Sequence, residues 1–176
     1  MKSKRTSAPG EGLQVSADSP DWTREGKKWS EWAPGRSLLA SIRGYQRVNA
    51  TRKFWNLLLK LIFTLRHRWW SIVTGADIPT NCQIGGGLRI PHPNGIVIHP
   101  QAVIGPNCLI FQQVTIGVRD DDSKAPCIGG HVDIGAGAKI LGAVTIGNHA
   151  KIGANAVVLD DVPDGATAVG IPAKLI

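Results

Sequence analysis

The sequence predicts a mainly β protein, in which a parallel β-helix follows a short helical region. Beyond residue 76 an aliphatic residue recurs every six positions. The uninterrupted run is Ile128, Ile134, Ile140, Ile146, Ile152 and Val158. An α-helix cannot keep such residues on one face, because six steps of about 100° leave the last residue well off its starting side. The 21 glycines, 11 prolines and 6% aromatic residues also favour short strands joined at tight corners.

Three six-residue units can close one triangular turn of a coil. Each aliphatic residue then stacks on the one about eighteen positions earlier, so that each turn is stabilised by its neighbours, as in other solenoids. We assign residues 76–176 to this coil, with about five turns and one long loop. The period does not fix the handedness, and the usual rule for crossovers would favour a right-handed coil.

The first 34 residues are polar and lack a hydrophobic period, which predicts a flexible basic arm. Trp22, Trp29 and Trp32 leave a second interpretation open, because their spacing would also suit a short docking helix. The opening residues contain no apolar stretch of the kind found in secretory signals, so we expect a cytoplasmic protein.

Residues 35–75 are predicted to be helical, most clearly from Lys53 to Ser71. A narrow polar stripe runs down this helix, formed by Lys53, Asn56, Lys60, Thr64, His67 and Ser71. Nearly all other positions are apolar, so the favoured interpretation buries them against other subunits or the coil and leaves the stripe in water. An interfacial membrane helix is the alternative. Lys60, Arg66 and Arg68 interrupt any uncharged run long enough to span a bilayer.

The net charge of +7 is unevenly distributed. Residues 1–70 contain 14 Lys and Arg against 5 Asp and Glu, whereas residues 71–176 contain 6 against 8. A nucleic-acid-binding domain would place its basic patch on the folded coil, so no nucleic-acid partner is expected.

The cysteines and histidines do not indicate a metal centre. Cys82, Cys108 and Cys127 lack the spacing of a disulfide framework or a zinc site. We interpret His99, His131 and His149 as surface or corner residues, and a three-histidine zinc site is only a minor alternative. No metal is expected.

Two interruptions of the six-residue period are the candidate functional segments. The step from Ile90 to Ile98 is eight, because two extra residues enter between Pro91 and Gly95, with His92 among them. The second interruption, "VRDDDSKAPC", covers residues 118–127. Loops that leave a rigid scaffold often carry its chemistry.

The stretch "GADIPTNCQIGGGLRIPHPNGIVIHPQAVIGPNCLIFQQVTIG" and the later "IGAGAKILGAVTIGNHAKIGANAVVL" resemble the serine acetyltransferases of the hexapeptide-repeat acyltransferase family. The resemblance covers about residues 72–176 and extends weakly to "LLASIRGYQRV". It implies a left-handed coil and transfer of acetyl from acetyl-CoA to the hydroxyl of L-serine, in cysteine biosynthesis. It also implies a homotrimer or a dimer of trimers.

The same resemblance gives the interruption at His92 a catalytic role. It makes His92 the general base and Asp77, fifteen positions upstream, its partner. A serine hydroxyl attacks a thioester poorly until a base of near-neutral pKa takes its proton, and histidine suits that task. The carboxylate would hold the imidazole in the correct tautomer.

Resemblance also assigns a cofactor path. Gly117, Ala136 and Ala154 match positions where small residues let the pantetheine arm of acetyl-CoA approach the backbone. Lys151 and Lys174 match positions near the CoA phosphates.

The substrate clamp departs from the family pattern. Serine acetyltransferases carry an aspartate before the catalytic histidine and an Arg-His pair in the later loop, where this chain has Pro91, Lys124 and Ala125. Two alternatives therefore stay open. One is an O-acetyltransferase acting on a sugar or exopolysaccharide precursor, and the other is a non-catalytic oligomeric β-helix scaffold.

Overall fold

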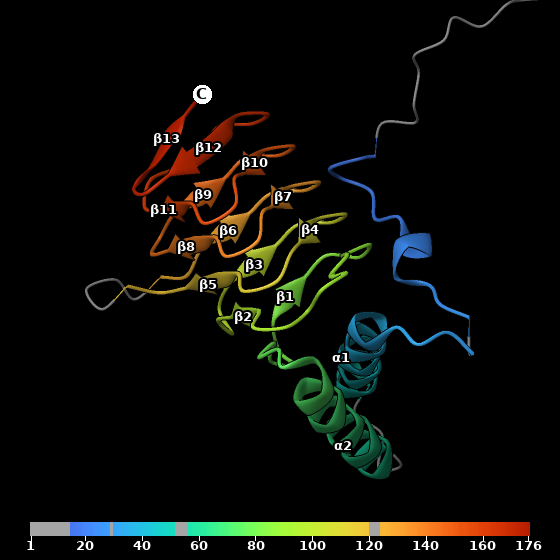
Figure 1. Cartoon of the computed structure of the whole chain (residues 1–176). Helices are drawn as coiled ribbons and strands as arrows, with labels where there is room; N and C mark the ends of the chain where they lie inside the picture. The colour runs from blue at the N-terminus through green and yellow to red at the C-terminus, as the bar shows by residue number, and fades with distance from the viewer. Residues whose placement is uncertain (1–14, 29, 52–55, 120–123) are drawn as a thin grey trace, which may run out of the picture.

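The computed structural model describes residues 15–28, 30–51, 56–119 and 124–176. Short parallel strands wind into a three-sided coil that stands on two helices, and the last strand, β13, lies at the far end of the coil (Figure 1). The prediction of a parallel β-helix is therefore confirmed.

Each side of the coil is one sheet. The first sheet contains β1 (Gln83–Ile84), β3 (Val103–Ile104), β6 (Cys127–Ile128) and β9 (Thr145–Ile146). The second contains β4 (Leu109–Ile110), β7 (Asp133–Ile134), β10 (Lys151–Ile152), β12 (Thr167–Gly170) and β13 (Ala173–Leu175). The third contains β2 (Val97–Ile98), β5 (Thr115–Gly117), β8 (Lys139–Leu141) and β11 (Val157–Val158). We call the corners after these sheets the first, second and third corners.

The strand register shows where the two interruptions enter. Thr115 pairs with Val97, eighteen positions earlier, as the uninterrupted period predicts. Val103 pairs with Gln83, a step of twenty, because the segment around His92 adds two residues at the second corner. Cys127 pairs with Val103, a step of twenty-four, because the later loop adds six residues at the third corner. The parallel pairing of successive turns is therefore kept across both insertions.

The interior of the coil is filled by ladders of aliphatic residues. Ile110 and Ile134, for example, stack in register on adjacent strands of the second sheet and are fully buried. Burial of each such side chain contributes about 1.5–3 kcal/mol relative to exposure. Since every turn presents the same residue types, the ladders hold successive turns in register.

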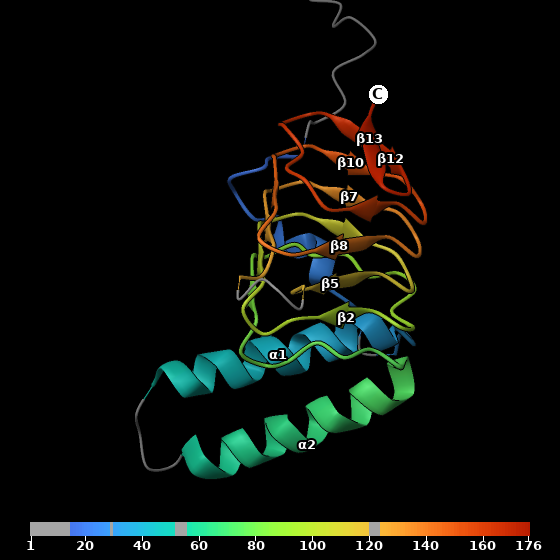
Figure 2. The same ribbon diagram turned by 90° about the vertical axis from the view of Figure 1, so that its left-hand side faces the viewer.

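Helix α1 (Pro34–Ala50) closes the lower end of the coil (Figure 2). Leu38, Leu39 and Ile42 are fully buried and belong to the same apolar core as the ladders. Without this lid the first turn would expose its aliphatic interior to water. Polar contacts fix the lid, since the Gln46 amide donates to the carbonyls of Thr80 and Cys82.

Helix α2 (Asn56–Thr74) lies outside α1 (Figure 2). Its polar and apolar faces are oriented opposite to the sequence expectation. Its polar stripe turns inward. His67 Nε2 lies 2.9 Å from the Ile78 carbonyl oxygen, and the Asn56 amide donates to the Val48 carbonyl. The expectation that the stripe would be wet is wrong in this structure, because the backbone carbonyls beside α2 need polar partners. Lys53 lies outside the described residues.

Most of the apolar side of α2 consequently faces outward. No helix in the described part of the chain has both the length and the apolar character needed to cross a membrane.

Residues 15–28, which we call the strap, run along the first corner of the coil. The buried Asn107 side chain donates to the Ser16 and Ser19 carbonyls and accepts from the Asp21 amide. This part of the expected flexible arm is therefore bound to the coil. These contacts were not predicted, because a segment without hydrophobic period gives no sign of packing. It can nevertheless form hydrogen bonds with polar groups along a corner.

Small residues on the coil make room for the strap. A side chain at Gly130 would collide with the Ala17 backbone, and one at Gly86 would collide with the Trp22 ring. The strap forms a single 3-10 turn, Trp22–Glu25. Trp29, which the alternative docking helix would require, lies outside the described residues.

Candidate active site

The segment that carries His92 sits at the base of the second corner. Its next residues are tied to the turn above, because the Gln113 amide N–H donates to the Asn94 carbonyl and the two side chains also bond at 2.9 Å. Similar bonds link the turns above it at the same corner and form a column. The Gly137 amide donates to the Gln112 carbonyl, and the Asn155 amide donates to the Ala136 carbonyl. Three such steps at about 4.8 Å each give a continuous edge of about 14 Å above the His92 segment.

His92 and Asp77 lie at the same end of the coil. The Asp77 N–H donates to the Ile96 carbonyl, and the Asp77 carbonyl accepts from Ile98, so its backbone forms the bottom rung of the third sheet. Asp77 lies between the buried residues Ala76 and Ile78, which turns its side chain outward. His92 is also exposed. No hydrogen bond joins these two described side chains, although catalytic hydrogen bonds are often long before substrate binds.

Four of the five residues assigned to acetyl-CoA lie along one path. Ala136 and Ala154 occupy the second corner on adjacent turns, above the His92 segment. Lys151 lies on β10 of the second sheet, three residues before Ala154, and β12 connects β10 to β13, which holds Lys174. The two alanines thus lie above the candidate base His92, and the two lysines lie on the second sheet beside or beyond them.

Gly117 lies apart from this path. It ends β5 at the third corner, in register with Leu141. Lys124 and Ala125 also belong to the third corner, because they follow β5 and precede β6. Pro91 is at the second corner with His92. Within one chain, the third sheet separates the two groups of predicted substrate residues.

A pocket of about 240 Å³ opens beside Pro91. The strap contributes Arg24, helix α1 contributes Arg36, the segment between them contributes Glu31, and the coil contributes Arg89. Arg36 pairs with Glu31 at 3.2 Å. Burial, followed by the nearby positive charge of Arg89, lowers the pKa of Arg24. Arg24 and Arg89 therefore bring positive charge to a pocket that is also lined by Pro91, the residue before His92.

Asn94 and Gln113, which hold the His92 segment against the next turn, were not among the predicted site residues. Gln113 adopts a left-handed backbone (φ 61°) at a corner where Gly95 and Gly137 stand below and above it. The sequence contained one signal for Gln113, since it occupies a corner position where the turns below and above it have glycine, the residue that best tolerates a left-handed backbone.

His131 and His149 form a pair at the first corner, away from the candidate site. Their Nδ1 atoms are 3.0 Å apart on adjacent turns. Burial lowers the pKa of His131, Asp133 opposes the shift, and His149, Arg24 and Lys151 add to it. His99 belongs to the third corner, so the three histidines do not meet. No group of three or more potential ligand side chains that could hold a metal occurs among the described residues.

Known proteins share the sequence and fold of this chain. No family model matches the chain. A serine acetyltransferase of Haemophilus influenzae is 37% identical over 147 residues, which are 82% of this chain and 55% of that protein. Serine acetyltransferase 5 of Arabidopsis thaliana is 42% identical over 143 residues, 78% of this chain and 46% of its own. The chain thus spans about half the length of these relatives.

Solved structures agree with the sequence comparison. A serine acetyltransferase in complex with CoA aligns with a TM-score of 0.68 and 36% identity, over 82% of this chain and 58% of that one. Over most of its length the chain therefore shares the fold of the serine acetyltransferases. Its coil is left-handed, as the family resemblance implied. A soybean serine acetyltransferase complexed with serine aligns with a TM-score of 0.69 and 36% identity, over 81% of this chain and 57% of that one.

Proposed function

We propose that this hexapeptide-repeat protein transfers acetyl from acetyl-CoA to the hydroxyl of L-serine. The observation that carries the proposal is the column at the second corner, where the His92 segment stands below Ala136 and Ala154. A thioester lying along that column would end beside a histidine. The relatives whose names state serine acetyl transfer, and the neighbours solved with CoA and with serine, support the same assignment.

In the proposed reaction His92 accepts the proton of the serine hydroxyl while its oxygen attacks the thioester carbonyl carbon. A new C–O bond forms and the C–S bond breaks. His92 then returns the proton to the departing sulfur, so O-acetylserine and CoA leave with the base restored. Asp77 orients the imidazole and stabilises its protonated form.

Lys151 and Lys174 would bind the CoA phosphates, and the small corner residues would admit the pantetheine arm. Gly117 would approach the pantetheine arm from the third corner of a neighbouring coil, in the trimer proposed below. The arginines of the 240 Å³ pocket suit an acceptor that bears a carboxylate, because guanidinium groups bind carboxylates in two-point geometry. They offer a positive charge in place of the Arg-His pair that the later loop lacks.

We further propose that the chain acts as a homotrimer. The second corner of one coil, with His92 and Pro91, and the third corner of another, with Gly117, Lys124 and Ala125, could then form one site. A single chain separates these corners by a whole sheet, which is the argument for a neighbouring coil. A dimer of trimers would require a further contact, through the helices.

A second candidate function is O-acetylation of a sugar or exopolysaccharide precursor. Pro91 favours it, because proline cannot supply the carboxylate that would bind the serine ammonium group. A contact of that kind contributes about 1.5–3 kcal/mol, or about ten- to a hundredfold in affinity.

A single-turnover assay separates these functions. The full chain is mixed with acetyl-CoA and either L-serine or a panel of sugars and sugar nucleotides, and products are identified by mass spectrometry. We expect O-acetylserine. Acetylation of a glycan alone would assign the second candidate, and no transfer to any acceptor would support the non-catalytic scaffold.

A further inference from the structure

The outward face of α2 is an apolar surface that no other described residue of the chain covers. We define it by its large exposed side chains: Leu57, Leu58, Leu59, Leu61, Ile62, Leu65, Trp69, Ile72 and Val73. Leu58, Leu65 and Trp69 are 66%, 56% and 62% exposed. Isolated exposed leucines are ordinary, but a continuous helical face of them marks an interaction site.

Positive charge borders this surface on both sides. At about 100° per residue, Leu65 and Trp69 both fall within about 20° of Leu58, so the three lie along the centre of the face. Arg66 then projects from one margin and Arg68 from the other, and both are exposed. Long basic side chains in these places can keep their charges at a polar boundary while the centre enters an apolar phase.

The helical region carries no negative charge. Residues 33–76 contain eight Lys and Arg and no Asp or Glu. A second copy docked on this face would bring two sets of like charges together, whereas an anionic phospholipid surface would neutralise them. Basic amphipathic helices with an aromatic residue on the apolar side are typical of helices that lie in the membrane interface.

We propose that the outward face of α2 binds the surface of an anionic lipid bilayer, with the helix lying in the plane of the interface. The position of α2 suits this role. It is the outermost element at the end of the molecule that is remote from β13 (Figures 1 and 2). The sequence favoured a protein–protein interface here, but that interpretation assumed that the polar stripe would face water.

A trimer of parallel coils would strengthen the binding, because it would present three such faces at one end. Linked weak sites bind a surface with an avidity that exceeds each single affinity. The lipid proposal itself does not rest on the acetyl-transfer activity.

The test is co-sedimentation of the full chain with vesicles of phosphatidylcholine, alone or with about 30 mol% phosphatidylglycerol. We expect the wild type to sediment with the anionic vesicles and to be released by high salt. Arg66→Gln with Arg68→Gln should weaken binding about tenfold or more. The matched control, Lys27→Gln with Lys28→Gln, removes the same charge from the exposed strap and should leave binding unchanged.

Leu58→Glu with Leu65→Glu should abolish sedimentation while the circular dichroism spectrum and thermal midpoint stay those of the wild type. Mass measurement in solution tests the competing occupant. If the wild type fails to bind anionic vesicles, the lipid proposal is wrong. If that wild type also has twice the mass of the Leu58→Glu and Leu65→Glu variant, the face joins copies of the chain instead. Equal binding of the Arg66→Gln and Arg68→Gln variant would also overturn it.

Discussion

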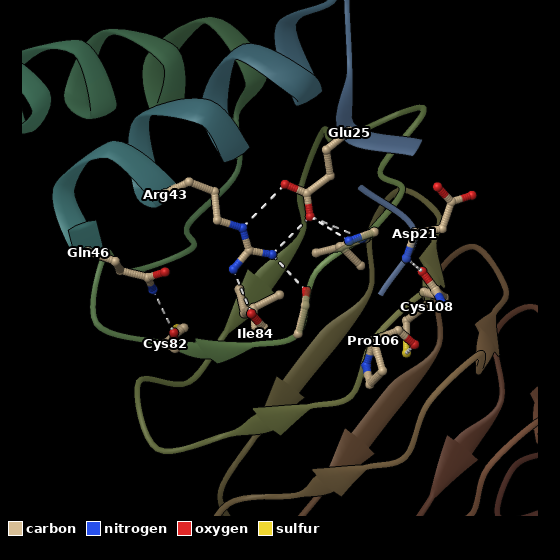
Figure 3. Close-up of polar contacts among 12 residues, drawn as sticks. Asp21, Glu25, Arg43, Gln46, Cys82, Ile84, Pro106 and Cys108 are labelled. Carbon is tan, nitrogen blue, oxygen red and sulfur yellow. Dashed lines mark hydrogen bonds and ion pairs between the residues drawn. The ribbon is translucent and has the colours of Figure 1, made fainter. Parts of the chain in front are cut away.

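The Glu25 carboxylate lies 2.9 Å from the Arg43 guanidinium, and both side chains are almost buried (Figure 3). This ion pair joins three parts of the molecule. Glu25 belongs to the strap and also accepts from the Gly87 and Leu88 amides of the coil. Arg43 belongs to α1 and donates to the Ile84 and Gly85 carbonyls. The pair therefore couples the strap, the lid and the first turn.

We predict that Glu25→Gln lowers the free energy of unfolding by about 1–3 kcal/mol, because it leaves the Arg43 charge without its counter-ion in a largely dry place. Urea denaturation measures the change. The matched control is Glu31→Gln, which breaks the exposed pair with Arg36 and should cost at most about 1 kcal/mol. Equal losses in the two variants would show that the buried pair contributes nothing special.

Replacement of the candidate base should affect the chemical step. We expect His92→Ala to lower kcat by about 10²–10⁴-fold while acetyl-CoA still binds, and Asp77→Asn to cause a smaller loss. Steady-state kinetics and a CoA binding isotherm check the two halves of this prediction. His149→Asn, at the first corner away from the candidate site, is the control and should keep its rate. Full activity of His92→Ala would remove the proposed mechanism.

The arginine pocket beside Pro91 should contribute to recognition of an anionic acceptor. We predict that Arg89→Gln raises the KM for L-serine about ten- to a hundredfold with little change in kcat, because a charge-assisted contact to the carboxylate is lost. Lys27→Gln removes a distant exposed charge and should leave both constants unchanged. An unaltered KM in Arg89→Gln would place the acceptor elsewhere.

His131 at the first corner should make the coil sensitive to acid. Burial lowers the pKa of His131, so the folded protein binds this proton less readily than the unfolded chain. The stabilising contribution is present above about pH 6.5 and is lost as pH falls through the lowered folded pKa.

His131→Asn tests this prediction. Asparagine tolerates the left-handed backbone (φ 53°) that His131 adopts. Thermal midpoints between pH 8 and pH 5 should fall less in His131→Asn than in the wild type, and His99→Asn should behave as the wild type. A parallel decline in all three proteins would assign the acid sensitivity to other groups.

The sequence by itself determined the coil, because its six-residue period is local and admits no other regular structure. Ile128, Ile134 and Ile140 already define three sides of one turn. The same regularity exposed its own interruptions, so that the segment around His92 was predictable as a departure from the period. The family resemblance then supplied chemical roles that periodicity could not provide.

Tertiary structure alone decided which face of α2 turns inward and whether the strap binds the coil. The polar stripe of α2 turned inward because the Ile78 and Val48 carbonyls beside it need partners, and no pattern within the helix records that need. The strap is bound because Asn107, 86 to 91 residues away, offers two donors and one acceptor to its backbone. A local period reports which residues repeat along the chain. Contacts between distant segments depend on which polar groups the fold leaves unsatisfied, and only the assembled coil and helices determine those.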